Sequence, residues 1–117
     1  MINSIGSTLS GLYSHNKKMA VSANNIANIN TDGFKKSRAV IKEGTNGEVT
    51  VDIHKIETPG SLIHYREGEK VTQTESSNVD YSEEAVNMII AHRGFEASLK
   101  ALQAEEEMLG SLLDIKV

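Results

Sequence analysis

The stretch from Tyr81 to Leu113 constrains the fold most, because its apolar residues recur every seven positions. One row holds Met88, Phe95, Leu102 and Leu109, and a second row holds Ala85, Leu99 and Leu113. Spacings that alternate between three and four residues are typical of a helix that packs against another helix. Such a helix spans roughly 50 Å, longer than a compact domain of this mass needs. We therefore expect its apolar seam to find a partner outside any small core.

The start of this helix is indicated by Asp80 and Glu83. The Asp80 carboxylate can accept a hydrogen bond from the backbone N–H of Glu83, while the Glu83 side chain reaches back to the backbone of Asp80. This capping-box pattern predicts a helix that begins near Tyr81.

The first 28 residues carry a second seven-residue pattern. One row holds Ile2, Leu9 and Ala23, and the other holds Ile5, Leu12, Met19 and Ile26. Asn16 fills the vacant place on the first row, where it either fixes register at some cost in stability or simply faces water. Gly6 and Gly11 each weaken the helix by about 1 kcal/mol relative to Ala. We expect this helix to need a packing partner.

The middle of the chain reads as turns and short strands. Asn and Asp residues followed by Gly33 end the first helix, and Gly33 can take a positive φ. Residues 37–43 and 48–56 are rich in β-formers and flank a turn at 44–47, and a second strand pair is expected at 62–65 and 70–74. The predicted fold class is mainly α with a small β insert (α+β), in which N- and C-terminal coiled-coil-forming helices are joined by a short antiparallel β-hairpin region. The expected divisions are 1–30 for the N-terminal assembly helix, 31–78 for the turn and β-rich insert, and 79–117 for the C-terminal assembly helix.

The composition allows only a small hydrophobic core, and the charges are distributed unevenly along the chain. Only 38% of the 117 residues are hydrophobic, and the absence of cysteine excludes disulfides. Residues 1–43 carry six Lys or Arg against two acids, whereas residues 44–117 carry six against fourteen. This asymmetry favours association between the two parts over nucleic-acid binding, and it predicts that Lys17, Lys18 and Lys35 meet acids such as Glu105 to Glu107 of a neighbouring chain. We expect neither a cleaved signal peptide nor a membrane span.

No catalytic or cofactor motif is present in the sequence. The histidines His15, His54, His64 and His92 lack the spacing of metal ligands, and no serine, histidine and carboxylate pattern suggests a nucleophile. The sequence therefore predicts no enzyme activity, no cofactor and no metal site. His92 falls on the predicted seam, where it either pairs with a carboxylate and makes assembly sensitive to pH or lies at the edge in water.

Two segments resemble known sequences residue by residue, which is more than an apolar repeat alone provides. SANNIANINTDGFKK (residues 22–36) and ESSNVDYSEEAVNMIIAHRGFEASLKALQAEEEML (residues 75–109) resemble the N- and C-terminal signatures of the bacterial flagellar axial proteins, the rod and hook subunits. His92, Gly94 and Ser98 stand where that family commonly has Gln, Ala and Asn. The short insert between the two signatures resembles that of a small proximal-rod type subunit.

The resemblance implies a structural, self-assembling subunit of the flagellar basal-body rod, whose terminal helices pack into the axial tube that transmits torque. It implies largely disordered free monomers, export by the flagellar export apparatus, a place in the periplasmic rod, and partners that are copies of itself and other axial proteins. The residues expected at contacts between subunits are Ile5, Leu9, Leu12, Asn16, Met19, Asn24, Asn25, Ile26, Asn28, Asn30, Gly33, Phe34, Asn78, Asp80, Met88, His92, Arg93, Phe95, Leu99, Leu102 and Leu109. The alternative is a coiled-coil adaptor or regulatory paralogue that binds one helical partner without polymerising; two seams favour the first reading.

Overall fold

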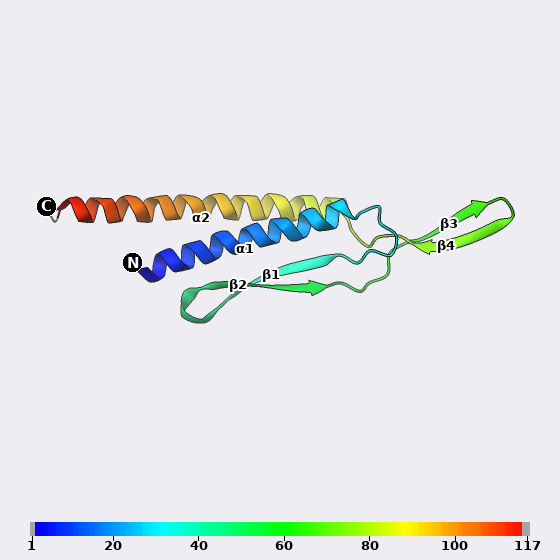
Figure 1. Ribbon diagram of the computed structural model, residues 1–117, viewed down its shortest axis with the longest axis horizontal. Coiled ribbons are helices and arrows are strands. Elements are labelled where there is room, and N and C mark those ends of the chain that lie inside the picture. Colours follow the sequence, from blue (N-terminus) through cyan, green and yellow to red (C-terminus); the bar gives the residue numbers. More distant parts are fainter. Residues whose placement is uncertain (1, 116–117) are drawn as a thin grey trace.

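The structure is a computed structural model that describes residues 2–115, with the side chain of Ile2 outside the description. The elements in chain order are α1 (Ile2–Ala27), β1 (Ser37–Glu43), the short 3-10 turn η1 (Thr45–Gly47), β2 (Val49–Lys55), β3 (Leu62–Glu67), β4 (Lys70–Glu75) and α2 (Tyr81–Ile115). The molecule is a rod of 85 × 23 × 15 Å (Figure 1). Two long helices and two small antiparallel hairpins confirm the predicted α+β class.

The two helices lie antiparallel and side by side along the rod (Figure 1). Near the start of α1, Ser4 and Thr8 donate hydrogen bonds to Glu105 Oε1 at 2.7 and 3.2 Å. Further along, a Cβ built on Gly11 would lie 3.3 Å from Ser98 Oγ. Because Ser4 lies opposite Glu105, the last turns of α2 extend past the start of α1.

Asp80 caps α2 as the sequence predicts, but Glu83 does not complete the box. Asp80 Oδ1 accepts hydrogen bonds from the backbone N–H groups of Ser82 at 2.8 Å and Glu83 at 3.2 Å, and the helix begins at Tyr81. The Glu83 side chain instead binds Lys36 and Arg38. These two cations offer a charged partner, which the backbone of Asp80 does not.

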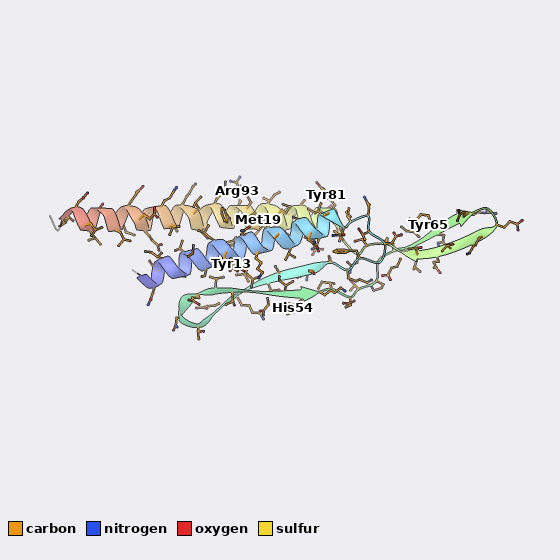
Figure 2. The ribbon with its side chains drawn as sticks, in the orientation of Figure 1. Tyr13, Met19, His54, Tyr65, Tyr81 and Arg93 are labelled. Atoms are coloured by element: carbon orange, nitrogen blue, oxygen red, sulfur yellow. The ribbon has the colours of Figure 1, made fainter. Side chains whose placement is uncertain are left out.

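Both hairpins form with the predicted turns. Strands β1 and β2 pair from Ser37 opposite Lys55 to Glu43 opposite Val49, and this sheet lies along α1. Strands β3 and β4 pair around Gly68, whose φ of 64° is the left-handed conformation that glycine adopts without strain. This second hairpin projects beyond the helices (Figure 1), and Figure 2 shows its side chains, Tyr65 among them, standing out from the ribbon.

The interior of the monomer is polar. Among the described residues Ala91 is the one buried hydrophobic residue, whereas Ser14, Ser22, Asn25, Lys36, Glu84 and Glu105 are buried as well. Large apolar side chains on both helices are exposed. Since burial of apolar area is the main favourable term in folding, this monomer gains little from its own core.

Candidate assembly surface

One of the two predicted rows of α2 lies toward α1. The second row in the contact with α1 lies one residue earlier in the sequence than the sequence pattern predicts. Met88, Phe95, Leu102 and Leu109 are half-buried. The companion row in the structure consists of Glu84, Ala91, Ser98 and Glu105, of which Ala91 is 0% and Glu105 9% exposed.

The second row that the sequence predicts on α2 is therefore exposed to solvent at most of its positions. Leu99 is 41% exposed and Leu113 is 67% exposed, and Glu106 is exposed too. His92 is not in the seam within the chain either: its side chain is 62% exposed, with Nδ1 3.9 Å from Glu96 Oε2. The predicted row through His92 and Leu99 therefore lies outside the α1–α2 contact of one chain, and its contact with a neighbouring subunit stays a prediction.

Small side chains explain why the row of α2 that contacts α1 lies one residue earlier than predicted. Gly94 packs directly on the ring of His15, with no room for a Cβ, and Gly11 faces Ser98. A close approach of two helix backbones needs small side chains at the contact, and the row with Ala91 and Ser98 supplies them. A larger row through His92 and Leu99 would hold the helices apart.

On α1 the two predicted rows also differ in their surroundings. Ile5, Leu12, Met19 and Ile26 are half-buried. Leu9, Asn16 and Ala23 of the other row are exposed, while the side chain of Ile2 lies outside the described residues. The remaining face of α1 contacts the β1–β2 hairpin through serines: Ser10 Oγ accepts the N–H of Val49 at 2.9 Å.

The exposed apolar residues of the two helices include Val86, Ile89 and Ile90 of α2 and two longer strips. The outer strip of α1 consists of Leu9, Tyr13, Asn16, Ala20, Ala23 and Ala27. The side strip of α2 consists of Ala97, Ala101, Ala104, Met108, Leu112 and Ile115. Each follows helical spacings of three and four residues, and each lies outside the α1–α2 contact. Contiguous apolar patches of this kind mark surfaces that bind another protein.

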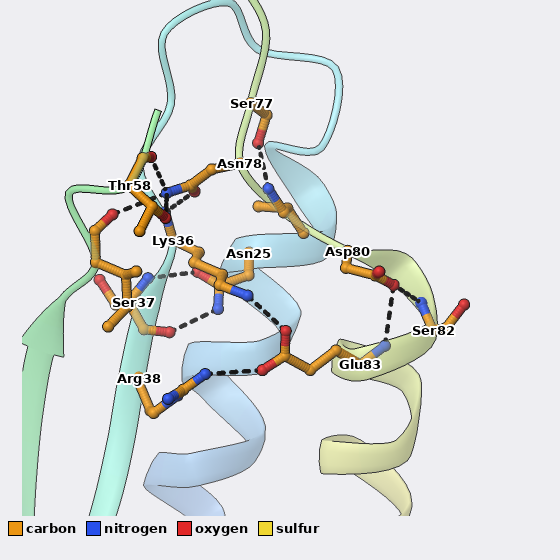
Figure 3. Close-up of polar contacts among 12 residues, drawn as sticks. Asn25, Lys36, Ser37, Arg38, Thr58, Ser77, Asn78, Asp80, Ser82 and Glu83 are labelled. Atoms are coloured by element: carbon orange, nitrogen blue, oxygen red, sulfur yellow. Dashed lines mark hydrogen bonds and ion pairs between the residues drawn. The ribbon is translucent and has the colours of Figure 1, made fainter. Parts of the chain in front are cut away.

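A buried polar joint holds α1 to the β insert (Figure 3). Asn25 is 0% exposed; its Nδ2 donates to the carbonyl of Ser37 at 2.7 Å and its Oδ1 accepts the N–H of Ser37 at 2.9 Å. Because both polar atoms are used inside the chain and the side chain is enclosed, we remove Asn25 from the expected contacts between subunits.

Asn78 forms the matching half of the joint, just before α2. Its Oδ1 accepts the N–H of Lys36 at 2.7 Å, and its Nδ2 donates to the carbonyls of Ile56 at 2.8 Å and Thr58 at 2.9 Å (Figure 3). One amide therefore ties together the start of β1, the end of β2 and the start of α2.

Ion pairs reinforce the joint. The hydrogen bond from Lys36 is the main reason that the pKa of Glu83 is lowered, and Arg38 adds a second contact at 2.9 Å. The pKa of Asp80 is lowered chiefly by the backbone N–H of Glu83. Lys35 pairs with Glu75, which lowers the pKa of Glu75 and links the joint to β4.

The other predicted contact residues near the joint have mixed exposure. Asn28 is half-buried and bonds within the turn, donating to the carbonyl of Asn24 at 2.9 Å. The side chains of Asn24 and Asn30 are exposed, as are Gly33 and Asp80, and Phe34 is half-buried. Arg93 lies on the side of α2 away from α1 (Figure 2) and pairs with Glu96 at 3.0 Å. The exposed members remain candidates for contacts with a neighbouring subunit.

Sequence reasoning missed the polar contact row. Glu84, Ala91, Ser98 and Glu105 repeat every seven residues, as the apolar rows do. A search for apolar residues passes over this repeat, so its regular spacing was the one available signal. The ion pairs of Glu83 with Lys36 and Arg38 join positions far apart in the chain and have no local pattern.

Within residues 2–115 the structure offers no metal site and no membrane-spanning helix. No group of three or more histidine, aspartate or glutamate side chains there is placed to hold a metal ion. Neither described helix is long and apolar enough to cross a bilayer. His15 lies in the helix contact, where burial, followed by the charge of Lys18, lowers its pKa.

Comparison with known families agrees with this geometry. The model described as "Flagella basal body rod protein" matches residues 7–35, which cover most of α1 and the turn after it. The model described as "Flagellar basal body rod FlgEFG protein C-terminal" matches residues 73–115, which cover α2 and the segment leading into it. The chain belongs to the flagellar axial family of rod and hook subunits. The two matches cover most of α1, all of α2 and the joint residues Asn25 and Asn78, whereas the joint residues of β1 and of the segment after β2 lie outside them.

Individual relatives come from both rod and hook. The flagellar hook protein FlgE of Helicobacter pylori is 29% identical over 111 residues, covering 92% of this chain and 14% of the hook protein. The flagellar basal-body rod protein FlgG of Bacillus subtilis is 49% identical over 43 residues, 37% of this chain and 16% of FlgG. FlgE of Borreliella burgdorferi is 55% identical over 38 residues, 32% of this chain and 9% of that protein. The chain therefore spans a small part of the relatives it matches.

Proposed function

We propose that this flagellar axial subunit is a component of the basal-body rod, which assembles with copies of itself and with other axial subunits through its two helices. The observation that carries the proposal is the inverted burial of the monomer: its enclosed side chains are mostly polar, while large apolar side chains are exposed along both helices. A neighbouring subunit that covers the outer strip of α1 and the side strip of α2 would supply the missing apolar burial.

A place in the rod, as opposed to the hook, is supported by the small insert. Between the helices the chain builds two hairpins, and neither carries a β domain of its own. A short insert on a stiff helix pair suits a narrow axial tube that transmits torque. Export by the flagellar export apparatus and a periplasmic position are parts of the same proposal.

The rival function is a coiled-coil adaptor that binds one helical partner and does not polymerise. Two apolar strips on different helices favour the polymerising subunit, because a single partner helix covers one strip and leaves the other exposed.

Sedimentation across a range of concentrations separates the two functions. The full chain should form species that grow with concentration, and Met108→Glu in the side strip should suppress this growth while the helical signal in circular dichroism is kept. Gln103→Glu, which adds the same charge to an exposed position of α2 outside the side strip, serves as the control and should still assemble. A monomer that stays monomeric at every concentration would favour the adaptor.

A further inference from the structure

We propose that the carboxylate of Glu75 holds the β3–β4 hairpin in one fixed direction relative to the helices, and that without it the folded hairpin rotates about its base. The base of the hairpin consists of Gly33, Lys35, Gly60, Glu75 and Ser76. This inference concerns a single chain and goes beyond the proposed function, because it identifies the side chain that makes the hairpin a rigid arm.

The β3–β4 hairpin has little support along its length. Every residue from 61 to 73 is exposed, and Figure 1 shows the hairpin projecting beyond the helices. Arg66 Nε–H donates to the carbonyl of Gly68 within the hairpin, and the ion pairs of the described chain all lie outside residues 62–74. A segment with few buried contacts moves unless another part of the chain holds it. The direction of the hairpin therefore depends on its base.

Glu75 is the last residue of β4, and its side chain binds two other segments. Its Oε1 accepts hydrogen bonds from Lys35 Nζ and from the backbone N–H of Gly60, the latter at 2.7 Å. Lys35 lies between α1 and β1, whereas Gly60 leads into β3. Hydrogen bonds between charged partners are stronger than those between neutral ones. Because the Lys35 side chain is only 15% exposed, water screens this ion pair less than one on the open surface.

Backbone contacts bring the same segments close together. The N–H of Gly33 donates to the carbonyl of Glu75 at 2.7 Å, and the N–H of Ser76 donates to the carbonyl of Ser61 at 2.8 Å. Gly60 packs against the carbonyl of Ser76 with no room for a Cβ. These backbone hydrogen bonds define an axis about which the hairpin can rotate. Since a side chain stands out of the plane of the strand backbones, the Glu75 carboxylate adds a point of attachment away from that axis and fixes the angle.

Loss of the carboxylate removes this attachment and leaves the hairpin itself paired. Lys35 Nζ and the N–H of Gly60 then lose their shared acceptor. The ladder that runs from Leu62 opposite Glu75 to the turn is made of backbone groups and does not need the carboxylate. With the carboxylate present, exposed side chains of the hairpin such as Tyr65 (Figure 2) are held at a set distance from α2.

Distances between two spin labels test this inference, because the native chain has no cysteine. Labels are attached at Glu69→Cys, in the turn of the hairpin, and at Ile90→Cys on α2, both exposed positions. Electron paramagnetic resonance of the labelled full chain, diluted into an excess of the same chain without labels, measures the distances within one chain. We expect one narrow distribution, and Glu75→Val should widen it at least about twofold.

Three further variants separate the carboxylate from general effects of substitution. Glu75→Gln keeps an acceptor oxygen for Gly60 and Lys35 and should restore most of the narrow distribution. Lys35→Met removes the cation and keeps the hydrogen bond from Gly60, so its distribution should be intermediate in width. Glu43→Val makes the matched change at the last residue of β1, which is exposed, and should leave the width unchanged.

Two measurements show whether the Glu75→Val chain stays folded. Circular dichroism should keep the native helical signal, and nuclear Overhauser contacts between Tyr65 and Thr72, which lie opposite each other in the hairpin, should persist. If Glu75→Val loses the helical signal, Lys35→Met takes its place. A Lys35→Met distribution as narrow as the native one then contradicts the inference.

Each other outcome overturns the inference. A native distribution as broad as that of Glu75→Val means that the hairpin has no fixed direction. Equal widths for Glu75→Val and the native chain, or equal broadening by Glu43→Val, mean that the Glu75 carboxylate does not set it. Loss of the Tyr65–Thr72 contacts means that the hairpin melts instead of rotating. None of these results concerns assembly through the helices, so the proposed function would stand.

Discussion

At the scale of single residues, Asn25 and Asn78 are the polar side chains on which the position of the insert depends. Each uses its amide as both donor and acceptor toward backbone groups of distant segments. A buried asparagine is tolerated only when its hydrogen bonds are made, and here each one is matched. Within the asparagine-rich segment, Asn25 therefore serves the fold of the subunit itself, whereas Asn24 and Asn30 are exposed.

Replacing Asn25 with Ala should destabilise the isolated chain by about 2–4 kcal/mol, because the N–H and carbonyl of Ser37 then lose their partners inside the protein. Urea unfolding followed by circular dichroism measures the change. Asn24→Ala is the matched control, since the Asn24 side chain is exposed, and it should change stability by no more than about 0.5 kcal/mol. Equal effects of the two substitutions would show that the joint does not hold α1 to β1.

His15 gives the helix contact a dependence on pH. Its pKa is lowered in the folded chain, mainly by burial against α2 and further by Lys18. As the pH falls below about 6.5, the unfolded chain takes up a proton that the folded chain resists, so stability decreases with falling pH. The loss is at most about 1.4 kcal/mol per pH unit for one proton.

Unfolding free energies of the isolated chain between pH 5 and 7.5 measure this effect, with His15→Gln beside the native chain. We expect the native curve to fall toward pH 5 more steeply than the His15→Gln curve. His64→Gln on the exposed hairpin is the control and should leave the native slope in place. The carboxylates of Glu75, Asp80 and Glu83 contribute at lower pH, because their lowered pKa values make stability fall as they are protonated. Parallel native and His15→Gln curves would contradict the account.

At the scale of elements, the sequence predicted the existence and type of each helix and hairpin, and Asp80 placed the start of α2. Alternation and seven-residue repeats are local signals, so they are readable from the chain alone. Which face of each helix packs inside the chain was harder to predict. Which row of α2 meets α1 depends on close packing between Gly94 and His15, and that pairing joins distant positions. For the same reason the sequence did not separate the rows that meet within one chain from the rows of Leu9 and Leu99, which are exposed.

The half-buried row of α2, which contains Leu102, leads to a test within one chain. Leu102→Asp places an unpaired charge in the half-buried contact with α1 and should reduce the free energy of unfolding by about 2–4 kcal/mol. Lys100→Ala, on the exposed side of α2, should change it by less than about 0.5 kcal/mol. Thermal unfolding of both variants in dilute solution gives the comparison. A Leu102→Asp chain as stable as the native one would remove this row from the helix contact.

At the scale of the whole molecule, the chain is a stiff rod with few apolar contacts of its own. The helix pair has a polar interior, and the β3–β4 hairpin extends away from it (Figure 1). An isolated chain of this shape buries little apolar surface. In an assembly, neighbouring subunits can cover the exposed apolar side chains. The family matches at both helices agree with this interpretation.

Electron microscopy of purified basal bodies tests the central claim most directly. Cells would carry the full chain with a compact tag in the exposed turn between β3 and β4, which lies away from the helices. The account predicts tag density on the rod, and loss of that density when Met108→Glu is introduced into the side strip of α2. Basal bodies that are complete and carry no tag anywhere along the rod, while the tagged chain is present in the cells, would contradict it.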